Sequence, residues 1–100
     1  MQVKQFYNKN QFIIIDDENN IKYFQSYNSK IAKMDYTNNI LTIYKNWDYS
    51  KTTLKHFYLF LNDCVYQIFK LIENSKNKKM DFEKLLNTTQ NNIKIIYQNN

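Results

Sequence analysis

The sequence predicts a single α+β domain, in which an antiparallel β-meander of four to five strands packs against one long helix, with a short terminal helix or strand added. Two observations support this fold class. Residues 1–47 form short β-rich segments separated by Asn-rich turns. Over residues 48–74, apolar residues recur in steps of three and four, as they do in an amphipathic helix. One hundred residues suffice for one hydrophobic core, so residues 1–100 are expected to fold as one domain.

The strands of the first half are expected over residues 4–7, 11–15, 21–27, 30–35 and 40–44. The turns between them are placed at residues 8–10, 16–20, 28–29 and 38–39. Because the chain contains no glycine, Asn is the residue that best tolerates a positive φ, and Asn pairs should form the hairpin tips. The run Ile13-Ile14-Ile15 indicates a central strand buried on both faces.

The second half should be mainly helical. The long helix is expected to run to about Asn74, and either Asp48 or Ser50 can cap its amino end. Residues 75–100 are expected to hold a linker and a short element, with the polar linker centred on residues 74–79 and Asp81 capping a short helix over 82–89. Residues 93–97 fit either a final strand or a helical turn. The apolar stripe of the long helix consists of Leu54, Phe57, Tyr58, Leu61, Val65, Ile68, Phe69 and Ile72.

The composition reflects an AT-rich genome before it reflects a function. The chain has no glycine and no proline, and its formal net charge of +5 comes entirely from lysine. Arginine makes the bidentate contacts by which proteins read bases, and lysine does not imitate them. The charge therefore has two interpretations, codon bias or a role in binding nucleic acid, and any such binding should be non-specific. The chain shows no signal peptide, no membrane span and a single cysteine, Cys64, which predicts a soluble protein of the cytoplasm.

The sequence favours a protein that is not an enzyme and has no cofactor or metal. His56 and Cys64 lie eight residues apart on the predicted helix. This places them about 12 Å apart along its axis, too far for a nucleophile and its base. We expect Cys64 to be buried and His56 to lie on the surface. The acidic run Asp16-Asp17-Glu18 is expected to be a solvated turn, since it lacks the glycine and ligand spacing of a calcium loop.

The junction over residues 45–53 holds the only tryptophan of the chain. It has two interpretations: a recognition loop in which large aromatic residues anchor a partner, or a structural corner in which Trp47 fills the edge of the core. In the first interpretation, the partner-binding residues are Trp47, Asp48, Tyr49, Lys51, Thr52, Lys55 and Tyr58. A second set could contact phosphate or form a solvated charged face, and consists of Lys76, Lys78 and Lys79.

Two strings of this chain, Ser26-Tyr27-Asn28-Ser29-Lys30-Ile31-Ala32 and the string from Trp47 to His56 (WDYSKTTLKH), resemble a family of small phage and mobile-element proteins of low-GC bacteria. The resemblance spans roughly residues 6–61. It implies a short accessory protein of the size class of anti-CRISPR proteins, which bind a host defence complex such as a Cas effector stoichiometrically. It carries over no catalytic residues. The alternative functions are a small basic nucleic-acid-binding accessory protein and an assembly factor of the element.

Overall fold

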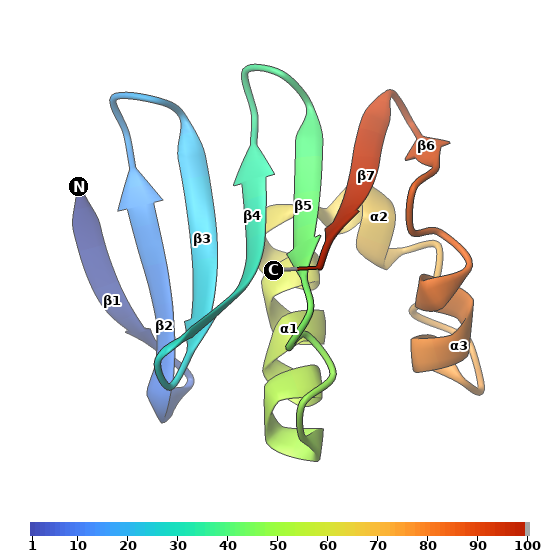
Figure 1. Ribbon diagram of the computed structural model, residues 1–100, viewed down its shortest axis with the longest axis horizontal. Coiled ribbons are helices and arrows are strands. Elements are labelled where there is room, and N and C mark those ends of the chain that lie inside the picture. The colour runs from blue at the N-terminus through green and yellow to red at the C-terminus, as the bar shows by residue number, and fades with distance from the viewer. Residues whose placement is uncertain (100) are drawn as a thin grey trace.

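Over residues 1–99, which the computed structural model describes, the chain forms one seven-stranded sheet with its helices on one side (Figure 1). The strands are β1 (Gln2–Phe6), β2 (Asn8–Asp16), β3 (Ile21–Ser26), β4 (Ser29–Asp35), β5 (Ile40–Tyr44), β6 (Thr89–Gln90) and β7 (Ile93–Gln98). The helices are α1 (Lys51–Cys64), α2 (Tyr66–Phe69) and α3 (Lys78–Glu83). The strand order across the sheet is β1-β2-β3-β4-β5-β7-β6, which confirms the α+β fold class.

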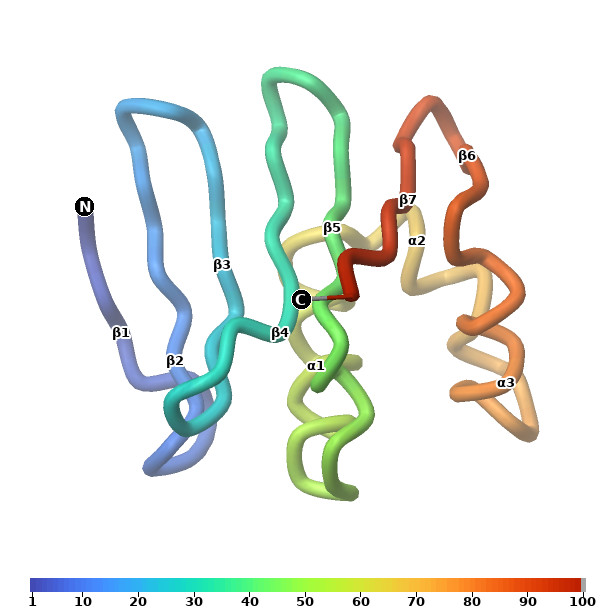
Figure 2. The backbone as a smooth tube through the Cα atoms, viewed as in Figure 1, coloured from blue at the N-terminus to red at the C-terminus, as the bar shows by residue number. Residues whose placement is uncertain are grey.

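The predicted meander is confirmed, and the tail extends it. Strands β1 to β5 pair in sequence as antiparallel neighbours. The chain then passes through the helices and returns, so that β7 lies beside β5 and pairs with it in parallel (Figure 2). A parallel pair requires such a long crossover connection. Residues 93–97 are therefore a strand, and the sheet is mixed rather than purely antiparallel.

The expectation that Asn residues form the hairpin tips is confirmed only in part. Asn20 and Asn39 have positive φ values of 57° and 55°, as expected for tips without glycine. Two other turns use tyrosine instead, since Tyr7 has a φ of 64° and Tyr27 a φ of 55°. The first turn is thus at Tyr7, and the predicted turn at residues 8–10 is wrong because β2 already begins at Asn8.

Contacts distant in sequence hold the two tyrosine turns. The Tyr7 hydroxyl donates a hydrogen bond to Asp63 Oδ2 on α1 at 2.7 Å, and the Tyr7 ring packs edge-on against Phe6. The Tyr27 backbone N–H donates to the carbonyl oxygen of Asn10 at 2.7 Å. A positive φ costs a bulky residue energy, so surrounding structure must supply such contacts.

The core lies between the sheet and α1. Ile13, Phe24, Ala32 and Ile43 are register partners on four successive strands, and all four are buried. Above this row lie Phe57, Phe60 and Leu61 of α1, each 0% exposed. The expected burial of residues 13–15 on both faces is wrong, because the helices cover one face only and Ile14 points to the other.

The long helix predicted over 48–74 is interrupted. Helix α1 ends at Cys64, and Val65 has a φ of −142° and a ψ of 55°, outside the helical region. The break is held by the Tyr36 hydroxyl, which donates to the Cys64 carbonyl oxygen at 2.6 Å. The apolar spacing still marks inward positions, since Val65, Ile68 and Ile72 are all buried. Ser50 caps α1 by accepting from the Thr53 N–H, whereas Asp48 does not cap it.

The carboxy-terminal helix is also shifted. Helix α3 begins at Lys78 instead of Phe82, and Asn77 caps it by accepting from the Met80 N–H at 3.1 Å. The carboxylate of Asp81, the predicted cap, instead accepts a hydrogen bond from the Ser75 hydroxyl. Phe82 is 0% exposed and anchors α3 on the core. Over residues 1–99 no helix combines the length and apolar character needed to cross a membrane.

Tyr36 should make the stability of the fold sensitive to alkaline pH. Burial and the contact with Cys64 raise the pKa of Tyr36 well above its ordinary value. The folded state therefore favours the neutral phenol. Its contribution is fully present below the unfolded-state pKa of about 10, and it is lost as the pH rises towards the folded-state pKa. Denaturant titrations from pH 8 to pH 12 should show Tyr36→Phe about 1 kcal/mol less stable than wild type near neutrality. The variant should lose less stability at high pH. If the free energy of unfolding fell equally steeply above about pH 10 in wild type and in Tyr36→Phe, this role of Tyr36 would be contradicted.

Candidate functional site: a hydroxyl-lined hollow at the amino end of α1

The surface of the protein is hollowed where two distant segments meet. The hollow has a volume of about 650 Å³ and is lined by residues from the β3–β4 turn and from the β5–α1 junction. The first segment runs from residue 26 to 31 and the second from 46 to 53. The strands β3 and β5 finish at the same end of the sheet, and α1 begins at that end too (Figure 1). The two segments are therefore brought together.

Hydroxyl groups join the two segments. Ser26 Oγ and Thr53 Oγ1 lie 3.0 Å apart and are buried, linking β3 to the first turn of α1. Ser50 Oγ donates to Thr53 Oγ1 at 3.1 Å while it also caps the helix. Asn46 Nδ2 donates to Ser29 Oγ at 3.4 Å across the hollow's other side. The floor is therefore preorganised by hydrogen bonds rather than by ion pairs.

The rim of the hollow carries two exposed tyrosines. The side chain of Tyr27 is 53% exposed and that of Tyr49 is 75% exposed. Each is a large ring with a polar end, a combination that is enriched at protein interfaces. The lining contains hydroxyl, amide and phenol groups and one apolar side chain, Ile31, but no charged group. Such walls suit binding through hydrogen bonds and ring contacts.

Trp47 belongs to the core, so its interpretation as an exposed partner anchor is wrong for this structure. Its side chain is 3% exposed, and its ring centroid lies 5.4 Å from that of Phe57 and 5.3 Å from that of Phe82. The physical reason is that the indole packs against Phe57 of α1 and Phe82 of α3, where burial of a large aromatic ring stabilises the core. The structural corner is therefore the correct interpretation of Trp47, while its neighbour Tyr49 stays outside.

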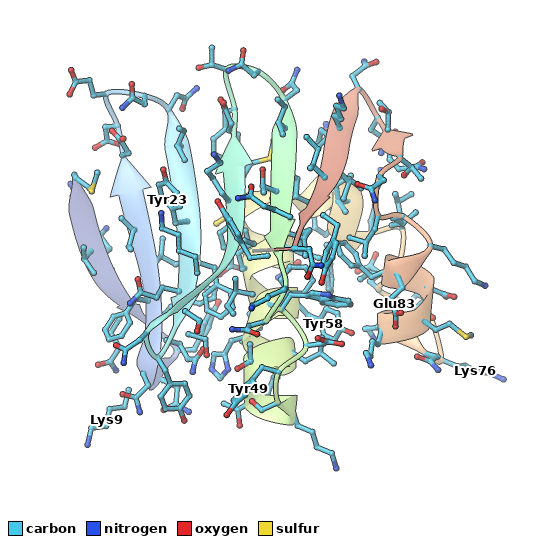
Figure 3. All side chains as sticks on the ribbon, in the orientation of Figure 1. Lys9, Tyr23, Tyr49, Tyr58, Lys76 and Glu83 are labelled. Atoms are coloured by element: carbon cyan, nitrogen blue, oxygen red, sulfur yellow. The ribbon has the colours of Figure 1, made fainter. Side chains whose placement is uncertain are left out.

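The other predicted partner residues divide between two places. Tyr49 and Thr52 line the hollow. Lys51, Lys55 and Tyr58 lie on one stripe of α1, since they are four and three residues apart. Tyr58 is turned towards α3, where burial and then the charges of Asp48 and Glu83 raise the pKa of Tyr58 to about 12. Figure 3 shows Tyr49 near the lower end of α1, and Tyr58 higher, on the side of Glu83.

The three lysines of the predicted linker do not form one free cluster. Lys79 Nζ lies 3.3 Å from Asp48 Oδ2, so this ion pair fastens α3 to the β5–α1 junction. Lys78 and Lys79 lie in the first turn of α3, and Lys76 precedes it. In Figure 3 the side chain of Lys76 extends away from the body of the protein. The ion pair also assigns Asp48 a structural role.

The expected surface position of His56 is wrong, and Cys64 is less buried than expected. His56 is buried at 4% exposure, and its Nδ1 lies 2.8 Å from the Thr52 carbonyl oxygen. Cys64 is half-buried, and burial raises the pKa of its thiol. A thiol with a raised pKa stays protonated and unreactive near neutral pH. Among residues 1–99 no group of three or more His, Cys, Asp or Glu residues is placed to hold a metal ion.

The sequence-based site omitted the Ser26–Ser29 turn, which forms one wall of the hollow. A signal for it was present, because this turn begins the string Ser26–Ala32, one of the two strings on which the expected resemblance rests. The second string begins at Trp47 and includes the opposite wall. Two strings that are separate in the sequence thus face each other across one hollow.

Comparison with known proteins places the chain in a family. The model of a family of unknown function, DUF8033, matches residues 1–84, a span that includes both walls of the hollow. No curated protein and no solved structure matches the chain. Because the matched span covers well over half of the sequence, this protein belongs to the DUF8033 family.

Proposed function

We propose that this protein is an accessory protein of a phage or mobile element that acts in the bacterial host's cytoplasm. It binds and inhibits a defence complex there by protein–protein contact, as anti-CRISPR proteins do. The observation that supports this most is the convergence of the two resembling strings on one hollow with exposed tyrosines at its rim. Residues brought together from separate segments, without a core role for Tyr27 or Tyr49, fit a surface that recognises a partner.

The chemistry of the surface suits binding rather than catalysis. Exposed tyrosines contribute large contact areas at low cost in conformational entropy. The uncharged hollow between them can receive a side chain or loop of the partner, and Lys51 and Lys55 add positive charge beside it. Aromatic anchors lie near the centre of protein interfaces, and Tyr27 and Tyr49 are exposed enough to serve as such anchors.

Plasmid transformation tests the proposal. The protein is expressed in strains that each carry one active defence system, with CRISPR–Cas systems first, and a targeted plasmid is introduced. Transformation should rise towards the level of an untargeted plasmid in the strain that carries the true target. A tagged protein should co-purify with that complex at a dissociation constant of about nanomolar order. Unchanged interference in every strain, together with no complex on the tagged protein, would reject the proposal.

A further inference from the structure

The face of the sheet opposite the helices is uncovered over residues 1–99. Strand alternation and register place one row of side chains across it, running through Val3, Ile14, Tyr23, Lys33, Thr42 and Ile96. The partly buried hydrophobic residues of this face, among them Ile14 and Tyr23, do not pack against the core. They are shielded only by their neighbours on the sheet. This open face is the surface that Figure 3 views, with Tyr23 labelled on it.

Two tyrosines and two lysines form the centre of the open face. Lys30 Nζ lies 5.0 Å from the centroid of the Tyr23 ring, and Lys33 is the register partner of Tyr23 on β4. Tyr44 lies two residues beyond Thr42 on β5, which places it on the same face. Tyr44 is partly buried among its neighbours, and this burial first, and Tyr23 second, raise the pKa of Tyr44. Aromatic rings and ammonium groups therefore alternate over β3, β4 and β5.

The charge of the open face is positive where its rings lie. Lys30, Lys33 and Lys94 take no part in the ion pairs found over residues 1–99, which involve other lysines. The carboxylates of this face, Asp16 and Asp35, lie at the ends of strands. There they accept hydrogen bonds from Asn19 and from Asn38 respectively, and so belong to the turns. Lys33 is close enough to Asp35 to help lower the pKa of that carboxyl, but it forms no ion pair with it, and positive charge remains in excess beside the tyrosine rings.

We propose that the open face binds single-stranded nucleic acid, with bases on Tyr23 and Tyr44 and phosphates on Lys30 and Lys33. Aromatic rings provide stacking platforms that every base can use, and lysines follow the backbone without reading sequence. The strands that carry Tyr23 and Tyr44 are separated by β4, which sets them about 10 Å apart. A single strand spans this distance with its bases splayed, whereas a duplex keeps its base faces inside the stack.

A second copy of the chain fits this face less well. In a symmetric face-to-face dimer the same patch meets itself, so Lys30 and Lys33 would approach their own copies. Like charges brought together across an interface are unfavourable. A polyanion gains from the same lysines. The charge at the centre of the face thus selects nucleic acid over self-association.

Fluorescence anisotropy tests the inference with a labelled oligomer of about 20 deoxythymidines and a duplex of equal length. The oligomer should bind more tightly than the duplex, and its affinity should fall steeply from about 50 to about 200 mM salt. Tyr23→Leu and Tyr44→Leu, which keep an apolar side chain on the sheet, should each weaken binding about tenfold. Lys30→Gln with Lys33→Gln should reduce the salt slope by about 1.4.

The matched control is Lys51→Gln with Lys55→Gln, which removes the same charge from α1. This control should leave binding of the oligomer nearly unchanged. An equal loss from both lysine pairs would mean that net charge alone binds nucleic acid, and would overturn the assignment to the open face. Absence of binding at low salt would overturn it as well. So would a concentration-dependent dimer in sedimentation that Tyr23→Leu dissociates, because the face would then be a contact between copies.

Discussion

Replacement of Phe57 by alanine should lower the free energy of unfolding by about 3–5 kcal/mol. Phe57 is 0% exposed, and its ring centroid lies 5.4 Å from that of Trp47 and 5.0 Å from that of Phe82. These three rings join α1, α3 and the β5–α1 junction. Removal of the central ring leaves a cavity that two helices on a small sheet can fill only partly. Equilibrium unfolding in urea or guanidinium chloride measures the loss directly.

Two further variants make that measurement decisive. Leu61→Ala, also at a position that is 0% exposed, should cost about 2–5 kcal/mol. Tyr49→Ala, at a position that is 75% exposed, should change stability by less than about 0.5 kcal/mol. If Phe57→Ala cost less than about 1 kcal/mol, the cluster around Trp47 would not be the core of the carboxy-terminal half.

The combined change Tyr49→Ala, Lys51→Glu and Lys55→Glu should abolish inhibition of the target defence complex. It removes one ring from the rim of the hollow and reverses both charges beside it, so attraction becomes repulsion. The fold should survive, since all three side chains are exposed, and Lys51 lies in the first turn of α1, where a glutamate is favourable. Plasmid transformation in the responsive strain reports inhibition, and the melting temperature reports the fold.

A charge-matched variant on the opposite side of the molecule is the control. Lys33→Glu with Lys94→Glu also changes the net charge by −4, from +5 to +1, but places the change on the open face of the sheet. This variant should retain inhibition. Retained inhibition by the triple variant would show that the partner contacts another surface. Loss in both variants would point to the net charge of the protein instead of a defined patch.

Much of the fold could be predicted from local patterns. The spacing of apolar residues from Leu54 to Ile72 identified the inward side of the second half, and β-rich segments identified the strands from Ile21 to Tyr44. These features depend on periodicity, which a sequence displays directly. The break at Val65 was not predictable in this way, because it depends on a hydrogen bond from Tyr36, 28 residues away from Cys64.

The candidate site, like the fold, was predictable only where it depends on contacts between residues close in the sequence. The sequence by itself determined that a helix begins at a hydroxyl-rich junction after Trp47, with Ser50 as one of two possible caps, and Ser50 and Thr53 do bond to each other within one turn of this helix. Only the tertiary structure decided that Trp47 turns inward while Tyr49 stays outside, and that the Ser26–Ser29 turn forms the facing wall of the hollow. Capping is a contact between near neighbours, so local sequence specifies it. Burial of one ring and the meeting of two turns depend on how the strands pair and where α3 packs, and these are long-range choices settled by the whole core.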